Sequence, residues 1–208
     1  MIIPVILESD LQEIKKKLAI ISEVAEQIQI DVLDGTLVPT KTFLNIGTID
    51  KLVSKSQLEI HLMTKNPCLY LKDKLSHVKA VCAQVEAYDK IHDFVKIARA
   101  HGYETGISVL ENTPLENIEP WINKVDYVQF MTIKAGVQGN PLLPHVLEKI
   151  KTFRIKYPQI TVQSDGGAKL ENISQLRDAG VTNVVVGTGI FRTANPIETY
   201  KKFTYLLN

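Results

Sequence analysis

Residues Gln29–Pro39 read QIDVLDGTLVP, and the start of this stretch has the two-residue period of a β-strand. One face of the strand is aliphatic and consists of Ile28, Ile30 and Val32. The opposite face carries Gln29 and Asp31 into the protein interior. A buried carboxylate is costly to ionise unless a cation or hydrogen-bond donors meet it, so we expect Asp31 to be well partnered or functional.

Strand-like and helix-like runs alternate along the rest of the chain, eight of each, which is typical of parallel βα units. The strand-like runs are Ile2–Leu7, Ile28–Asp34, Leu58–Met63, Ala80–Glu86, Thr105–Val109, Tyr127–Thr132, Ile160–Asp165 and Asn183–Gly187. Amphipathic segments such as Leu11–Ala25 and Pro144–Tyr157 lie between them. No linker-like or low-complexity stretch divides the 208 residues. The pattern therefore predicts an α/β fold with a single domain over residues 1–208, a (β/α)8 TIM barrel near the lower size limit of that fold.

The composition excludes several classes of protein. The chain is 45% hydrophobic and 23% charged, with a net charge of +1 and no basic stripe, which argues against nucleic acid or an anionic membrane as main partner. No apolar run reaches the roughly 18 to 20 residues that span a bilayer. The start, MIIPVILESD, resembles a first strand and not a signal peptide. The two cysteines, Cys68 and Cys82, form no CxxC motif and fit a reducing compartment, so we expect a cytoplasmic protein.

The same two-residue period predicts a barrel interior that is unusually polar. The inward-facing set contains Gln29, Asp31, Glu59, His61, Gln84, Glu86, Gln129, Gln163 and Asp165. Barrel interiors are usually filled by branched apolar side chains, so this polarity indicates a functional site. Four of these residues would serve equally well as a polar network that touches no ligand. They are Glu59, Gln84, Glu86 and Gln163.

Asp31, His61 and Asp165 differ from the rest because each lies at or near the C-terminal end of its strand, where barrel active sites are built. The second and seventh strands are three steps apart around the ring. We therefore expect Asp31 and Asp165 to face each other across the mouth. Two opposed carboxylates suit chemistry that removes a proton from one face of a carbon and delivers one to the other face.

Glycine-rich turns follow three strands at this same end of the barrel. They are Asp165-Gly166-Gly167, Gly187-Thr188-Gly189 and Gly136-Val137-Gln138-Gly139. The two longest spacings between strands leave the loops Gly35–Asn45 and Ile133–Leu143 there too. Glycine lets backbone N–H groups approach an anion closely, and the loops after the last two strands are a common phosphate site in barrels. A phosphorylated ligand is therefore predicted.

At these residues the sequence resembles the ribulose-phosphate 3-epimerase family, nearly from end to end. The matching segments are Pro4-Val5-Ile6-Leu7, Asp31-Val32-Leu33-Asp34-Gly35 with Val38-Pro39, His61-Leu62-Met63 with Asn66-Pro67, Glu86-Ala87, Met131-Thr132, Asp165-Gly166-Gly167 and Gly187-Thr188. The resemblance implies an isomerase of carbohydrate metabolism that inverts C3 of a ketopentose 5-phosphate through an enediolate. It also implies a homo-oligomer.

The resemblance implies roles for individual residues. Asp31 and Asp165 would be the acid/base pair, and both would bind a divalent metal ion together with His61. Met63 and Met131 would form a dry wall around the intermediate. The residues implied to bind substrate or phosphate are His61, Met63, Met131, Gly136, Val137, Gln138, Gly139, Gly166, Gly167, Gly187 and Thr188.

The sequence departs from the family pattern at several of its functional positions. Gln29 stands where the family has a metal-binding His, and Val5 where it has a Ser near the substrate. The phosphate loop reads Gly-Val-Gln-Gly instead of Gly-Phe-Gly-Gly, Ser164 replaces a Val, and Leu33 replaces a Met. An amide oxygen is a poorer ligand than imidazole, so we expect a weakened metal site with Gln29 as the candidate fourth ligand.

Three functions stay open on the sequence alone. The first is an active epimerase with a weakened or different metal site. The second is a related sugar-phosphate epimerase, isomerase or lyase of different specificity. The third is a non-catalytic barrel that binds a phosphosugar, against which the retained Asp31 and Asp165 argue, because a pure binder has no need of opposed carboxylates.

Overall fold

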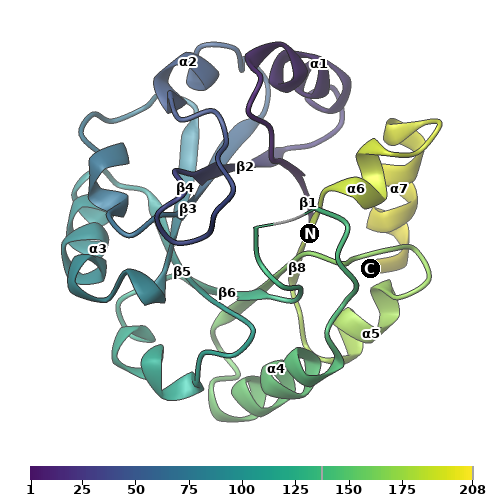
Figure 1. The fold of residues 1–208 in the computed structure, drawn as a ribbon. Coiled ribbons are helices and arrows are strands. Elements are labelled where there is room, and N and C mark those ends of the chain that lie inside the picture. Colours follow the sequence, from purple (N-terminus) through teal and green to yellow (C-terminus); the bar gives the residue numbers. More distant parts are fainter. Residues whose placement is uncertain (137, 208) are drawn as a thin grey trace.

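The computed structural model describes residues 1–136 and 138–207, and eight parallel strands in it close into a barrel in sequence order. The strands are β1 (Ile2–Ile6), β2 (Gln27–Leu33), β3 (Gln57–Met63), β4 (Val78–Gln84), β5 (Glu104–Val109), β6 (Tyr127–Met131), β7 (Thr161–Asp165) and β8 (Asn183–Val186). Figure 1, which looks along the barrel, shows the helices forming an outer ring around these strands. The predicted (β/α)8 barrel is confirmed, and every predicted strand ends within two residues of the observed one.

Seven α-helices surround the barrel in the part of the chain that the structure describes. They are α1 (Leu11–Ile21), α2 (Ile46–Asp50), α3 (Ile91–Ala100), α4 (Pro144–Lys156), α5 (Ile173–Asp178), α6 (Thr188–Phe191) and α7 (Pro196–Leu207). Short 3₁₀ turns complete the connections: η1 (Pro67–Tyr70), η2 (Val85–Lys90), η3 (Leu115–Asn117) and η4 (Glu119–Trp121).

The prediction of one helix after each strand is wrong after β3 and β5, where only 3₁₀ turns occur, while β8 is followed by two helices. Pro67 begins the turn after β3, and Pro114 and Pro120 interrupt the segment after β5. Proline lacks a backbone N–H and disfavours helical geometry in the residue before it, so these segments do not continue as α-helices.

The main hydrophobic core lies between the outer faces of the strands and the helices. Its β2 and β3 members are at most 1% exposed: Ile28, Ile30, Val32, Leu58, Ile60 and Leu62. Burying one such side chain contributes about 1.5–3 kcal/mol, so this layer supplies much of the stability of the barrel. The predicted aliphatic face of β2 therefore packs as expected.

The strand register stacks the polar inner residues in layers. The β2–β3 pairing sets Gln29 beside Glu59 and Asp31 beside His61. The β6–β7 pairing sets Met131 beside Asp165. Because successive residues alternate between the two faces of a strand, these partners share the inner face.

Glu86 is an exception to the predicted interior set. Strand β4 ends at Gln84, and Glu86 lies beyond it in η2. Its carboxylate accepts hydrogen bonds from Leu110 N at 3.0 Å and from the Thr113 hydroxyl. Glu86 thus ties the rim together and does not line the barrel, because the strand stops two residues earlier than predicted.

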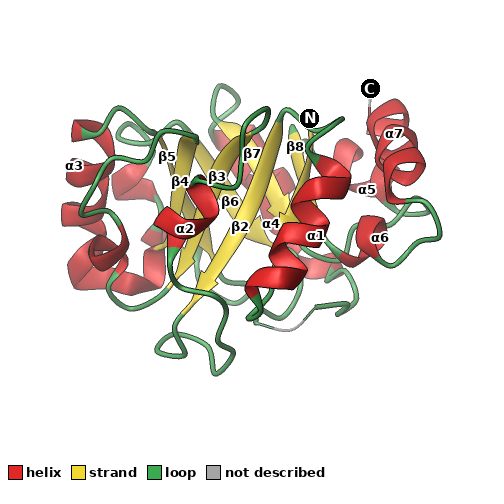
Figure 2. Cartoon of the chain, turned by 90° about the horizontal axis from the view of Figure 1, so that it is seen from above, coloured by secondary structure: helices red, strands yellow, loops and turns green. Residues whose placement is uncertain are grey.

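Figure 2, a side view, shows long loops gathered at the end where the strands finish. The loops after β2 and β6 are the two long ones that the sequence predicted at this end. Within the described residues, no helix combines the length and the apolar character that a membrane crossing requires.

Candidate active site

Asp31 at the end of β2, His61 on β3 and Asp165 at the end of β7 meet in the barrel interior. His61 Nδ1 lies 3.3 Å from Asp31 Oδ1 and 3.2 Å from Asp165 Oδ2. The three residues are 4%, 0% and 5% exposed in that order from β2 to β7. The predicted convergence is therefore present, and the two carboxylates, from strands three steps apart around the ring, both reach one ring nitrogen.

The side-chain amides of Gln29 on β2 and Gln129 on β6 donate hydrogen bonds to the two carboxylates. Gln29 Nε2 donates to Asp31 Oδ1 at 2.8 Å and to Asp165 Oδ2 at 2.9 Å. Gln129 Nε2 donates to Asp165 Oδ2 at 3.0 Å. Both amides belong to residues without measurable exposure, so these hydrogen bonds are shielded from water and strengthened accordingly.

The cluster is strongly coupled electrostatically. Burial opposes a charge on His61, but hydrogen bonds and charge interactions with Asp165 and Asp31 outweigh it and raise the pKa of His61 to about 10. Burial, together with the negative charge of Asp165, raises the pKa of Asp31, against the hydrogen bonds from His61 and Gln29. The site therefore favours a cationic imidazole between two acids, one of which readily takes up a proton.

Thr42, in the loop after β2, fixes the backbone that carries Asp31. Its hydroxyl donates to the carbonyl oxygen of Asp31 at 2.8 Å and accepts from Leu33 N at 3.0 Å. The loop thus closes back onto the end of β2. The sequence did not predict this contact, because a loop Thr can as well be exposed to solvent as bonded to the backbone.

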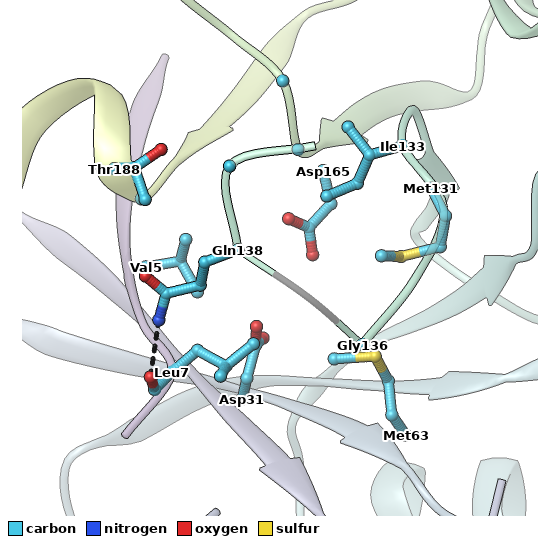
Figure 3. A pocket seen from close by; sticks show the side chains of 14 residues that line it. Val5, Leu7, Asp31, Met63, Met131, Ile133, Gly136, Gln138, Asp165 and Thr188 are labelled. Carbon is cyan, nitrogen blue, oxygen red and sulfur yellow. Dashed lines mark hydrogen bonds between the residues drawn. The ribbon is translucent and has the colours of Figure 1, made fainter. Parts of the chain in front are cut away.

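A pocket opens above the carboxylates at the C-terminal end of the barrel (Figure 3). It is lined by Val5, Leu7, Asp31, Met63, Met131, Ile133, Gly136, Gln138, Gly139, Asp165, Gly166, Gly167, Gly187 and Thr188. Figure 3 shows Met63 and Met131 on one side of the two carboxylates and Val5 and Leu7 on the other. All but two of the residues expected to bind substrate or phosphate line this pocket.

The two exceptions are His61, which lies buried behind the carboxylates, and Val137, which falls outside the described residues. Leu7 and Ile133 line the pocket although the sequence reasoning did not select them as site residues. Each lies one or two residues beyond the end of its strand. A rule that counts every residue just past a strand end would have found both.

Close backbone packing requires glycine at the loop after β7. Gly166 has φ of 105°, and a Cβ atom there would lie 2.4 Å from the side chain of Ile133. Gly167 has φ of 72° and packs against the backbone of Leu142. These two residues therefore bring bare backbone to the pocket wall, where larger side chains would not fit.

Comparison with known proteins identifies the family to which this chain belongs. The model of the "Ribulose-phosphate 3 epimerase family" matches residues 1–191. The chain belongs to the ribulose-phosphate 3-epimerase family. The resemblance drawn from short motifs is thereby confirmed, and the chain is an enzyme of the epimerase type.

Relatives named ribulose-phosphate 3-epimerase match most of the chain. The protein of Schizosaccharomyces pombe is 29% identical, over 95% of this chain and 89% of its own length. The cytoplasmic isoform of Oryza sativa subsp. japonica is 30% identical, over 84% of this chain and 79% of its own length. The family assignment thus rests on the whole barrel and not on one motif.

Solved structures of lower identity share the fold of this epimerase-family chain. A 3-hexulose-6-phosphate synthase is 17% identical, with a TM-score of 0.74 and 100% coverage of both chains. KGPDC from Streptococcus mutans is 12% identical, with a TM-score of 0.74 and coverage of 99% of this chain and 96% of its own. At these identities the likeness shows the barrel fold alone.

The donor set of the site fits the divalent cation that the epimerase family implies. One ligand atom each from Asp31, His61 and Asp165 can be chosen so that all lie within 4.8 Å of one another. Carboxylate oxygen and imidazole nitrogen are common ligands of divalent transition metals. Gln29, in contrast, directs its amide nitrogen at the carboxylates, and an amide nitrogen is no metal ligand.

Proposed function

We propose that this enzyme epimerises C3 of a ketopentose 5-phosphate, with ribulose 5-phosphate as the substrate to test first. The observation that carries the proposal is the meeting of Asp31 and Asp165, from distant strands, on one His61 nitrogen at the floor of a pocket. The names of the relatives support the substrate. Inversion of one carbon needs one group to take a proton and a second to supply one, and two carboxyl groups can do both.

The proton positions follow from the surroundings of the two acids. One aspartate, as the carboxylate, removes the C3 proton, and the other, as the carboxylic acid, delivers a proton to the opposite face. The raised pKa of Asp31, caused by burial and by Asp165, favours a state in which one proton is shared by the pair. Their roles exchange when the reaction runs in reverse.

Removal of a proton beside a carbonyl group places negative charge on the substrate oxygen atoms as an enediolate forms. A divalent cation held by Asp31, His61 and Asp165 would supply Lewis-acid stabilisation of that charge. His61 Nδ1 lies within hydrogen-bond reach of both carboxylates, and a protonated imidazole there would hold both acids in place. Met63, Met131 and the neighbouring Leu33 form an apolar cluster that excludes water from the intermediate.

We assign the phosphate group to the glycine turns after β7 and β8. Gly166, Gly167, Gly187 and Thr188 line one part of the pocket. None of the described lining residues is Lys or Arg, so backbone N–H groups have to provide most of the anion binding there. The bare backbone at Gly166 and Gly167 allows that close approach.

A related sugar-phosphate activity is the second candidate, and Val5 is the observation that favours it. Val5 lines the pocket where the family pattern has a hydroxyl-bearing Ser. In this second candidate, loss of that hydroxyl removes one hydrogen-bonding partner for substrate, and a different sugar would be preferred. Cytoplasmic location and homo-oligomerisation stay predictions from the sequence.

Deuterium exchange separates these functions. The purified chain is incubated with ribulose 5-phosphate in D₂O, with and without chelator, and deuterium at C3 is followed by NMR. Exchange that chelator abolishes supports the epimerase with a cation, and exchange that survives chelation removes the cation from the mechanism. Binding of the phosphosugar without exchange contradicts the proposal and favours a different specificity or a non-catalytic binder.

A further inference from the structure

Gln29 meets the reacting carboxylates with its nitrogen and not with its oxygen. Its Nε2 donates to Asp31 Oδ1 at 2.8 Å and to Asp165 Oδ2 at 2.9 Å. These are the same two oxygens that contact His61 Nδ1. The carbonyl oxygen of Gln29 is directed to Gln163 Nε2, 3.4 Å away.

A buried chain of hydrogen bonds along the barrel interior sets this direction. Gln163 Nε2 donates to Glu59 Oε1 at 2.6 Å and to Gln129 Oε1 at 2.8 Å. Glu59 also accepts from the Tyr127 hydroxyl at 2.8 Å and from Gln27 Nε2 at 2.7 Å. Asn183 Nδ2 donates to Gln163 Oε1 at 3.3 Å, so reversal of the Gln163 amide would set oxygen against Glu59 and nitrogen against Asn183.

Reversal of the Gln29 amide is therefore opposed from both sides. The turned amide would set its N–H groups against the nitrogen of Gln163. It would also set its carbonyl oxygen against the oxygens of Asp31 and Asp165. Unpaired buried donors and facing acceptors are both costly where water cannot enter.

We propose that Gln29 is a hydrogen-bond donor that ties Asp31 to Asp165, and that Glu59, acting through Gln163, holds it in this orientation. A divalent cation then has three protein ligands, Asp31, His61 and Asp165, and Gln29 is not the fourth. Glu59 and Gln163 are positioning residues, since they act on the carboxylates only through Gln29. The inference rests on the proposed function, in which these carboxylates exchange protons with substrate.

Co²⁺ titration of the substrate-free chain, followed by calorimetry and visible absorption, tests the role of Gln29. We expect Gln29→Ala to keep the wild-type visible absorption of bound Co²⁺, because its ligand set is unchanged, although loss of a hydrogen-bond partner of the carboxylates lowers the affinity. His61→Ala, which loses a ligand, changes the absorption. Gln29→His adds an imidazole ligand and gains about tenfold. Gln175→Ala is the matched control, because it removes the same side chain from an exposed position of α5, away from the three ligands and from Glu59.

Two results overturn the proposal. A Co²⁺ absorption spectrum in Gln29→Ala that differs from that of wild type makes Gln29 a ligand. Failure of the wild-type chain to bind Co²⁺ removes the three-ligand site. Both are read without substrate, so they are independent of the deuterium exchange that tests the activity.

The positioning role of Gln163 has its own readout. Gln163→Met releases the Gln29 amide to turn its oxygen toward a cation, so Co²⁺ affinity rises about threefold or more, and no rise occurs when Gln29→Ala is also present. In the wild-type chain, the ¹⁵N-attached side-chain protons of Gln29, assigned with Gln29→Ala, exchange slowly with water. Rapid exchange of these protons, or an affinity rise that persists in the double variant, contradicts the proposal.

Discussion

Gln138 donates its side-chain amide to the carbonyl oxygen of Leu7 at 2.6 Å, across 131 positions of sequence. The bond joins the loop after β6 to the end of β1, and both residues line the pocket (Figure 3). The family pattern has glycine at the position of Gln138, which provides no side chain for such a contact. In this chain, the loop after β6 is therefore fastened over the pocket by a side chain of its own.

Replacement of Gln138 tests whether this bond retains substrate. Loss of one hydrogen bond of about 1 kcal/mol should raise KM for ribulose 5-phosphate about fivefold in Gln138→Ala, with kcat within about twofold of wild type. Asn140→Ala is the matched control, because the side chain of Asn140 donates to Lys134 O, a contact inside the same loop. An unchanged KM in Gln138→Ala, measured by steady-state kinetics, would show that the bond does not hold the loop over substrate.

Removal of either proposed acid/base group should lower kcat while leaving the fold intact. We expect Asp31→Asn and Asp165→Asn each to reduce kcat by about 10²- to 10⁴-fold. Since each carboxylate serves one face of C3, one variant should still exchange deuterium with ribulose 5-phosphate only, and the other with its C3 epimer only. Asp178→Asn, on the exposed end of α5, is the control. Equal residual exchange of both epimers in both variants would argue against a division of labour.

The two cysteines should differ in reactivity. Burial raises the pKa of Cys82 well above its ordinary value, and the negative charges of Glu59 and Asp165 raise it further. A raised pKa keeps the thiol protonated, so a change from about pH 7 to about pH 9 should not make Cys82 reactive in the folded chain. Half-buried Cys68 should react with iodoacetamide as pH rises, and mass spectrometry assigns the label. Labelling of Cys82 at the rate of Cys68 would indicate that the barrel opens.

Glu59 should be needed as an acceptor more than as a charge. Glu59→Gln keeps an oxygen for Tyr127 and Gln163, and Gln27 can turn its amide to meet the new nitrogen, so the free energy of unfolding in urea should stay within about 1 kcal/mol of wild type. Glu59→Leu removes the acceptor of Tyr127 and Gln27 and one of the acceptors of Gln163, and should cost about 3 kcal/mol or more. Equal stability of the two variants would show that the buried network contributes little.

The two-residue strand period correctly predicted which side chains of β2 face the core and which face the barrel interior. The alternation around Asp31 predicted both the buried aliphatic face of β2 and an inner carboxylate, and both are observed. The same reasoning failed at Glu86, because the period does not say where β4 stops. It failed also after β3 and β5, where prolines leave only 3₁₀ turns.

The sequence by itself determined the barrel and the candidate groups Asp31, His61 and Asp165, because strand alternation and residue chemistry are local properties. Only the tertiary structure decided how those groups are joined. The single nitrogen shared by both carboxylates, the fastening of Gln138 to Leu7 and the direction of the Gln29 amide depend on strands far apart in the chain. An amide can donate or accept, and at Gln29 the choice is made by the neighbours that barrel closure brings to it.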